Sequence, residues 1–181
     1  MQNKRLIPDN TFFSFFLHNT DEADALREIA HNFYIEIPPK INHEIKSCQY
    51  SNKLKEFEDK LHIFKNNLDL DLSAFLNPLF SKGQKEKGEH DVLAVGYFCY
   101  NMQLEFIMII DDIGSRKFIK RNFSALEPYL EWTANFIKNC YKTYKIFNRD
   151  KTLDLLSKMG KSTFRIDKNI LSKLIEEIKN G

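Results

Sequence analysis

The chain has 181 residues, of which 43% are hydrophobic and 16 are phenylalanine, so we expect one domain with a sizeable core. No apolar run approaches the roughly 18 to 20 residues that a membrane-spanning helix needs, and Asp9 and Asn10 interrupt the first apolar segment, which argues against a signal peptide. The three cysteines, Cys48, Cys99 and Cys140, are widely spaced and odd in number. They indicate neither a disulfide framework nor a zinc site, so we expect a cytoplasmic protein.

Charge is unevenly distributed along the chain, although the formal net charge is only +2. Residues 1–113 hold 12 Lys and Arg against 18 Asp and Glu, whereas residues 114–181 hold 15 against 7. An acidic half joined to a basic half suits a metal-holding site beside a surface that binds a polyanion. It suits an ordinary solvated surface equally well, so charge alone does not choose between the two.

The first elements read as short strands that alternate with helices. Residues 6–8 predict a strand that runs into a helix, with Asp9 among the candidate capping residues. A second helix opens at Thr20, and residues 33–37 predict a second short strand. Two prolines end that strand and begin a new helix, and Glu44 falls within its first two turns.

The middle of the chain predicts further helices. Residues 50–66 place apolar side chains at helical spacing, which predicts an amphipathic helix. We expect residues 46–87 to form a helical insertion within a single domain that spans 1–181, because no repeat or linker divides the chain. The helix that follows has Glu89 and Asp91 in its first turn, where the helix dipole favours acids.

Five consecutive apolar residues, 106–110, predict a strand of a parallel sheet that is buried on both faces. This strand ends in Asp111 and Asp112, at the edge of an open sheet where ligands bind. Arg116 falls on the first turn of the next helix. An Asp pair is also the usual signature of a turn and a helix cap, and the two residues alone favour neither interpretation.

The last third predicts a short edge strand over 128–132, a helix capped by Thr133, and two further helices, the last capped by Asp167. Basic residues fall on or near the outer faces of these helices. Those that we single out are Lys138, Lys142, Lys145 and Arg149.

Four acids thus lie near the start or end of predicted elements, namely Asp9, Glu44, Asp91 and Asp111. A parallel sheet would gather three of them at one edge. Clustered carboxylates repel each other unless a divalent cation offsets their charge, and ligands that are all oxygen suit Mg²⁺ or Mn²⁺. Such an ion can activate water for in-line attack on a phosphodiester.

A resemblance rests on these segments together. The residues that carry it are Asp9-Asn10-Thr11, Ile37-Pro38 with Glu44, Gly88-Glu89-His90-Asp91-Val92-Leu93-Ala94, and Ile109-Ile110-Asp111 with Ser115-Arg116. In this order and spacing the chain resembles the PIN-domain ribonucleases, in the prokaryotic branch related to VapC-type toxins. The resemblance covers the chain end to end. It implies a three-layer α/β/α PIN-like domain with a short, mostly parallel central sheet and a helical insertion.

The resemblance also implies roles for individual residues. The catalytic acids would be Asp9, Glu44, Asp91 and Asp111. Of these, three would bind the metal ion, namely Asp9, Asp91 and Asp111. Supporting roles would fall to Glu89, Asp112, Arg116 and Thr133. Arg116 would touch the scissile phosphate or pair with an acid, and we favour the pairing.

We therefore expect an endoribonuclease that depends on Mg²⁺ or Mn²⁺. The RNA phosphates would be contacted by Lys138, Lys142, Lys145 and Arg149. If the chain is the toxin of a toxin–antitoxin pair, an antitoxin would insert a peptide near the acidic edge. The many aromatic side chains would serve either the core or the face of a homodimer.

Two alternatives stay open. A catalytically inactive PIN-like module that binds RNA or protein would have its acids far apart, or paired with Lys or Arg. A receiver-like phospho-acceptor domain ranks third, because the acids expected on its first strand are not doubled here.

Overall fold

The protein is a three-layer α/β/α domain in the computed structural model, which describes residues 4–57, 61–63 and 88–180. Within these residues five strands form one sheet in the order β3-β2-β1-β4-β5, and every neighbouring pair is parallel. The strands are β1 (Arg5–Pro8), β2 (Tyr34–Ile37), β3 (Leu61–Ile63), β4 (Phe106–Ile109) and β5 (Leu130–Glu131). The predicted α/β class with a short parallel sheet is confirmed.

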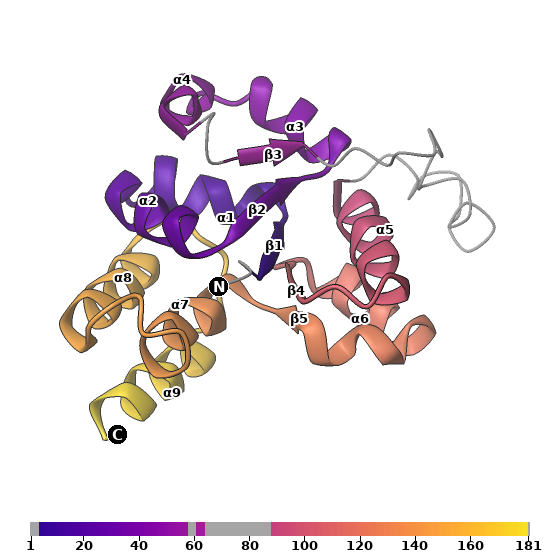
Figure 1. Cartoon of the computed structure of the whole chain (residues 1–181). Coiled ribbons are helices and arrows are strands. Elements are labelled where there is room, and N and C mark those ends of the chain that lie inside the picture. The colour runs from indigo at the N-terminus through magenta and orange to yellow at the C-terminus, as the bar shows by residue number, and fades with distance from the viewer. Residues whose placement is uncertain (1–3, 58–60, 64–87, 181) are drawn as a thin grey trace.

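Helices cover the sheet on both faces (Figure 1). In chain order they are α1 (Asn10–Ser14), a π-helix (Phe15–Asn19), α2 (Ala23–Asn32), α3 (Pro39–Lys46), α4 (Ser51–Leu54), α5 (Gly88–Asn101), α6 (Ile113–Asn122), α7 (Thr133–Lys142), α8 (Arg149–Lys161) and α9 (Lys168–Lys179). Helix α5 packs on β1 and β4 with α6 beside it, whereas α2 packs on β2 and stands on the same side as α7, α8 and α9. None of the helices described here is both long and apolar enough to cross a membrane.

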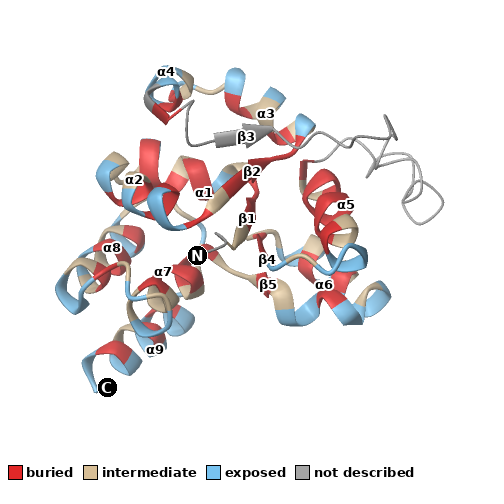
Figure 2. Ribbon diagram, in the orientation of Figure 1, coloured by how far each residue is buried: buried red, intermediate tan, exposed pale blue. Residues whose placement is uncertain are grey.

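The packing of the core explains why the sequence predicts strand β4. All four of its residues are buried, because β1 and β5 flank it and α5 covers one face. Helix α5 approaches this strand closely at Gly96, where an added Cβ would overlap the side chain of Met108. Buried residues concentrate on the strands and on the inward faces of the helices (Figure 2).

Phenylalanines fill the space between the sheet and the other helical layer. Phe12 of α1 and Phe16 of the π-helix are fully buried, with ring centroids 5.0 Å apart in an edge-to-face arrangement. Phe12 also meets Phe136 of α7 at 5.9 Å. These contacts hold the start of α1, and with it the end of β1, against α7.

Two sequence predictions need correction. The single amphipathic helix over 50–66 is wrong, since the described part of that range contains α4, a 3₁₀ turn over Lys55–Phe57 and the edge strand β3. A short helix and a 3₁₀ turn bury Leu54 and Phe57 as a continuous helix would, so periodicity does not separate the two. Helix α2 begins at Ala23 rather than Thr20. The rest of the predicted insertion, 64–87, lies outside the described residues.

Candidate functional site

The carboxyl ends of β1 and β4 bring two acids together. The strands pair in parallel with Pro8 opposite Ile109, so the residues that follow are neighbours. The backbone N–H of Asp111 donates a 2.9 Å hydrogen bond to Oδ2 of Asp9. The other oxygen, Oδ1, accepts a 3.1 Å hydrogen bond from the N–H of Phe12 and so caps α1. The structure thus joins two of the four predicted catalytic acids directly.

Asp9 is the more deeply buried of this pair, with 2% of its surface exposed. Burial raises the pKa of Asp9 well above its ordinary value, and the negative charges of Asp111 and Glu89 raise it further. Hydrogen bonds from the N–H groups of Asp111 and Phe12 act in the opposite direction without offsetting the rise. Negative charge is therefore costly at this position unless a cation approaches.

Asp111 is held by the first residue of α7. Its Oδ1 accepts a 3.0 Å hydrogen bond from the N–H of Thr133, and its Oδ2 accepts one from the hydroxyl of the same residue. Burial raises the pKa of Asp111, while these two hydrogen bonds and the charge of Arg116 lower it. The prediction that Thr133 caps α7 is wrong, because Trp132 is the N-cap residue. The Thr133 side chain bonds to Asp111 instead, as a supporting residue would.

Asp112 caps the next helix. Its Oδ1 accepts hydrogen bonds from the N–H of Ser115 at 2.6 Å and from the hydroxyl of Ser115 at 2.7 Å. This contact fixes the start of α6 directly after the acidic edge. Helix capping therefore accounts for the second of the two adjacent acids.

Arg116 fastens the ends of β4 and β5 to each other. Only 7% of its surface is exposed, and Nη1 donates hydrogen bonds to the carbonyl oxygens of Ile110 at 3.0 Å and of Glu131 at 2.7 Å. Its guanidinium lies 4.1 Å from the ring centroid of Trp132. These contacts support a structural role next to Asp111, with the aromatic ring held in a fixed position.

The two acids of α5 face different neighbours. Glu89 lines the same pocket as Asp111, and its charge raises the pKa of Asp9. Asp91 is 8% exposed and contacts Lys40 of α3, accepting a 2.9 Å hydrogen bond from its N–H and lying 3.5 Å from its ammonium nitrogen. The acid that α5 turns toward the strand ends is therefore Glu89, and the predicted metal ligand Asp91 lies against α3.

Glu44 of α3 lies at the start of α5. Its Oε1 accepts a 3.1 Å hydrogen bond from the N–H of Gly88, and an added Cβ on that glycine would fall 2.6 Å from the same oxygen. Burial raises the pKa of Glu44, and the charges of Glu89 and Asp91 raise it further. The structure thus places Glu44 beside the α5 acids.

The donor chemistry of the cluster can be tested against the expected ion. Among the described residues, no group of three or more His, Cys, Asp or Glu side chains is arranged to hold a metal ion. Mg²⁺ usually keeps several waters and is bound by one or two carboxylates together with substrate phosphates. The Asp9–Asp111 pair with Glu89 nearby offers only carboxylate oxygens, which fit an ion shared with a phosphate substrate.

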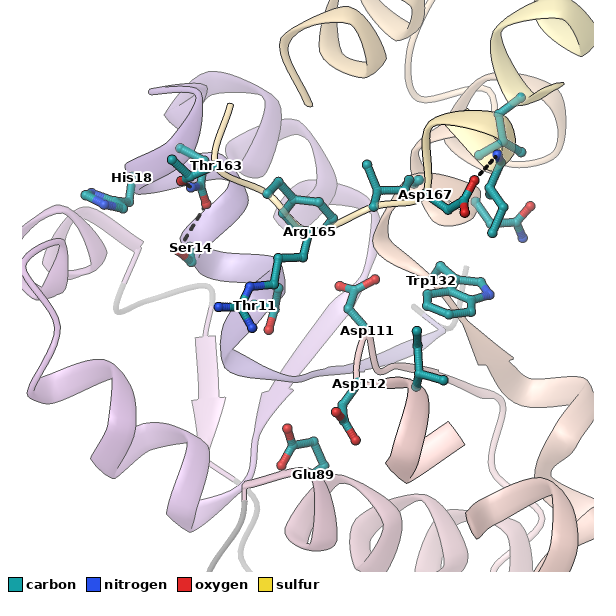
Figure 3. Close-up of a pocket in the computed structure, with 18 residues that line it drawn as sticks. Thr11, Ser14, His18, Glu89, Asp111, Asp112, Trp132, Thr163, Arg165 and Asp167 are labelled. Atoms are coloured by element: carbon teal, nitrogen blue, oxygen red, sulfur yellow. Dashed lines mark hydrogen bonds between the residues drawn. The ribbon is translucent and has the colours of Figure 1, made fainter. Parts of the chain in front are cut away.

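A pocket of about 880 Å³ opens at this edge (Figure 3). Helix α1 and the π-helix, the start of α5, the end of β4, α7 and the segment between α8 and α9 all contribute to it. In Figure 3 Trp132 and His18 lie at opposite ends of the pocket, with the acids and Arg165 between them. The polar side chains of its lining are Thr11, Ser14, His18, Asn19, Glu89, Asp111, Asp112, Asn135, Thr163, Arg165 and Asp167.

Several of these lining residues were not predicted from the sequence. Thr11, Ser14 and His18 are polar positions at helical spacing within a run of phenylalanines, a pattern that marks one non-core face and could have been read. Arg165 comes from the non-helical segment between α8 and α9, where no local pattern marks it. Its place in the pocket depends on how those helices pack.

The four basic residues predicted to contact RNA lie away from this pocket lining. The ammonium of Lys138 pairs with Glu177 at 2.9 Å, and the ammonium of Lys142 donates a 2.6 Å hydrogen bond to the carbonyl of the same residue. Arg149 donates to a carbonyl at the end of α9, and Lys145 lies 5.8 Å from an aromatic ring of α7. Three of them therefore fasten α9 to its neighbours, and their contact with RNA stays a prediction.

Comparisons of the chain with protein-family models, with curated proteins and with solved structures find no match. The likeness to PIN-domain ribonucleases consequently rests on the sequence motifs and remains a prediction.

Proposed function

We propose that the protein is an endoribonuclease of PIN type that depends on Mg²⁺ or Mn²⁺. The observation that carries the proposal is the Asp9–Asp111 pair at the ends of adjacent parallel strands, where the N–H of Asp111 donates a 2.9 Å hydrogen bond to Asp9 and Asp111 lines a pocket of about 880 Å³. Glu89 adds a third carboxylate close enough to perturb Asp9. Parallel α/β sheets bind their ligands at this edge.

Asp9 and Asp111 would hold the ion, with Glu89 beside them. When bound, a divalent ion supplies an activated water molecule for in-line attack on a phosphodiester. The protein orients both strand-end acids through hydrogen bonds from Phe12, Asp111 and Thr133. A carboxylate oxygen that accepts one such hydrogen bond retains a second lone pair for another partner. Burial keeps bulk water away from the oxygens of Asp9.

The pocket lining supports a polyanionic substrate next to the acids. Arg165 and His18 are basic side chains of this lining, and Thr11 and Ser14 add hydroxyl groups that can donate to phosphate oxygens. A strand that enters the pocket would therefore meet these donors together with Asp111 and Glu89.

The test is cleavage of mixed RNA by purified protein in Mg²⁺, Mn²⁺ or EDTA. Asp9→Asn and Asp111→Asn are expected to lower the metal-dependent rate by at least about a hundredfold, the effect typical of positioned catalytic groups. The matched control is Asp150→Asn, an exposed acid in the first turn of α8, which should cut as the wild type does. Equal cutting by all four proteins would reveal a contaminating nuclease and overturn the proposal.

The proposal extends to the cellular setting. The three cysteines carry free thiols, which fits a reducing cytoplasm. As the toxin of a toxin–antitoxin pair, the protein would arrest growth when expressed, and an antitoxin peptide would relieve the arrest by entering the acidic edge. Arrest by Asp111→Asn as strong as by the wild type would contradict this extension.

A second candidate is an RNA-binding module without catalytic activity. The observation that favours it is the contact between Asp91 and Lys40, since a basic partner reduces the tendency of an acid to recruit an ion. RNA that is bound but stays intact in both Mg²⁺ and Mn²⁺ would move the assignment to this module.

A further inference from the structure

Trp132 presents an aromatic surface to the pocket on a rigid support. The guanidinium of Arg116 stacks on its ring at 4.1 Å, and that guanidinium is tied to the carbonyl oxygens of Ile110 and Glu131. The ring is therefore held by the backbone at the ends of β4 and β5. Trp132 also lines the pocket, beside the acidic edge (Figure 3).

Two exposed isoleucines converge on the same pocket. Among the described residues, the exposed large hydrophobic side chains are Tyr100, Met102, Ile113 and Ile170. Ile113 at the start of α6 is 59% exposed, Ile170 of α9 is 45% exposed, and both line the pocket that contains Trp132. Single exposed apolar residues are ordinary, whereas several that meet in one concave site indicate a ligand with an apolar part.

The other side chains of the lining favour a ligand that also carries negative charge. Arg165 and His18 are basic, and Thr11 and Ser14 carry hydroxyl groups. The volume of about 880 Å³ lies within the range of roughly 300–1,000 Å³ that is typical of small-ligand sites. A flat ring joined to a phosphate satisfies both parts of the lining, which a purely apolar peptide would not.

We propose that this pocket binds an unpaired nucleotide of an RNA strand, with its base against Trp132, Ile113 and Ile170 and the adjoining phosphates near Arg165 and His18. The proposal rests on the ribonuclease function and names its substrate class. A base inside a duplex is covered by its neighbours and cannot offer a face to an aromatic side chain. The protein therefore selects single-stranded RNA.

Binding at this pocket can be followed by tryptophan fluorescence, because Trp132 is the only tryptophan in the chain. A base that stacks on it quenches its fluorescence. The titration uses a short RNA of mixed sequence, the duplex of the same RNA with its complement, and the same strand with its central bases removed. Each is added in Ca²⁺ buffer, and a gel of the same sample verifies that the strand stays intact.

Saturable quenching by the single strand, with little quenching by the duplex or the abasic strand, is the expected result. Equal quenching by all three, or none by any, would overturn the inference.

A double variant and a matched control test the exposed isoleucines of the pocket and leave the core unchanged. The double variant Ile113→Ser, Ile170→Ser should raise the Kd for the single strand about tenfold, as expected for the partial loss of one stacked base. Met102→Ser is the matched control, because that side chain is 58% exposed and lies off the pocket lining. An unchanged Kd in the double variant would overturn the inference.

These results separate the inference from the function on which it rests. Base-dependent quenching in a protein that cuts no RNA with Mg²⁺ or Mn²⁺ would keep the nucleotide pocket and reject the nuclease. Metal-dependent cutting without discrimination between single strand and duplex would keep the nuclease and reject the pocket.

Discussion

The N–H of Asp111 donates a 2.9 Å hydrogen bond to the carboxylate of Asp9, so two acids 102 positions apart in the sequence form one unit. Burial raises the pKa of both, and the charge of Asp111 further raises that of Asp9. A pair of this kind lowers its free energy by binding a proton or a cation. Both oxygens of each carboxylate already accept a hydrogen bond, which limits what can replace either acid.

The two isosteric variants of the pair should differ in stability. In Asp111→Asn the amide oxygen can accept from the N–H of Thr133, while the amide nitrogen can donate to the Thr133 hydroxyl. In Asp9→Asn the amide nitrogen must face the N–H of Phe12 or of Asp111, so one donor loses its acceptor. Both variants relieve the same repulsion. Urea unfolding in EDTA should therefore find Asp9→Asn about 1–3 kcal/mol less stable than Asp111→Asn. Equal stabilities would contradict this hydrogen-bond assignment.

The raised pKa of Asp9 also predicts a pH dependence of folding. Since the folded pKa lies above the ordinary value of about 3.9, the folded state binds more protons than the unfolded state between the two values. The contribution of Asp9 to stability therefore falls as the pH rises from about 4 through the raised pKa. In EDTA, the free energy of unfolding of the wild type minus that of Asp9→Asn should decline over this range.

The comparison with Asp9→Asn serves as the control for other acids. The pKa values of Asp21 and Glu177 are lowered by lysine partners. Their contributions to the free energy of unfolding therefore decrease as the pH falls, which is opposite to the pH dependence expected from Asp9. Both are present in each protein, so they cancel in the difference. A difference that rises with pH would contradict the assigned direction.

Local patterns were enough to predict the parallel sheet core and its paired acids. Residues 106–110 form a run too apolar for a half-exposed strand, and the ends of parallel strands meet by rule, which brought Asp9 and Asp111 together. Strand β3 was missed because an edge strand of three residues depends on pairing with β2, a contact that no sequence window contains.

The choice between Glu89 and Asp91 shows why the sequence alone could not predict the rest of the site. Residues two apart on a helix point in roughly opposite directions. Which of them turns toward the strand ends depends on the rotation of α5, and that is set by the close approach of Gly96 to Met108 and of Gly88 to Glu44. The sequence identifies both acids as candidates, and the packing of α5 determines which of them faces the strand ends.

The same rotation predicts which acid of α5 serves the metal ion. At a Mn²⁺ concentration of 100 times Kd, bound metal should stabilise the wild type by about 2.7 kcal/mol. Glu89→Gln should lose much of this gain, because its charge acts on Asp9. Asp91→Asn should keep it, because Asp91 contacts Lys40. Thermal unfolding with and without Mn²⁺ measures both, and the reverse result would restore Asp91 as the ligand that the sequence motif suggests.

The salt dependence of RNA binding distinguishes the pocket from the basic outer face of α7. Each phosphate contact on a single strand contributes about −0.7 to the slope of log K against log salt concentration. Arg165 lines the pocket, so Arg165→Gln should make this slope less negative by about 0.7. Lys142 donates to a backbone carbonyl of α9, so Lys142→Gln should leave the slope unchanged. Binding isotherms of a labelled single strand at several salt concentrations measure both. A slope that changes only in Lys142→Gln would place the RNA across α7 and α9, as the distribution of charge in the sequence first suggested.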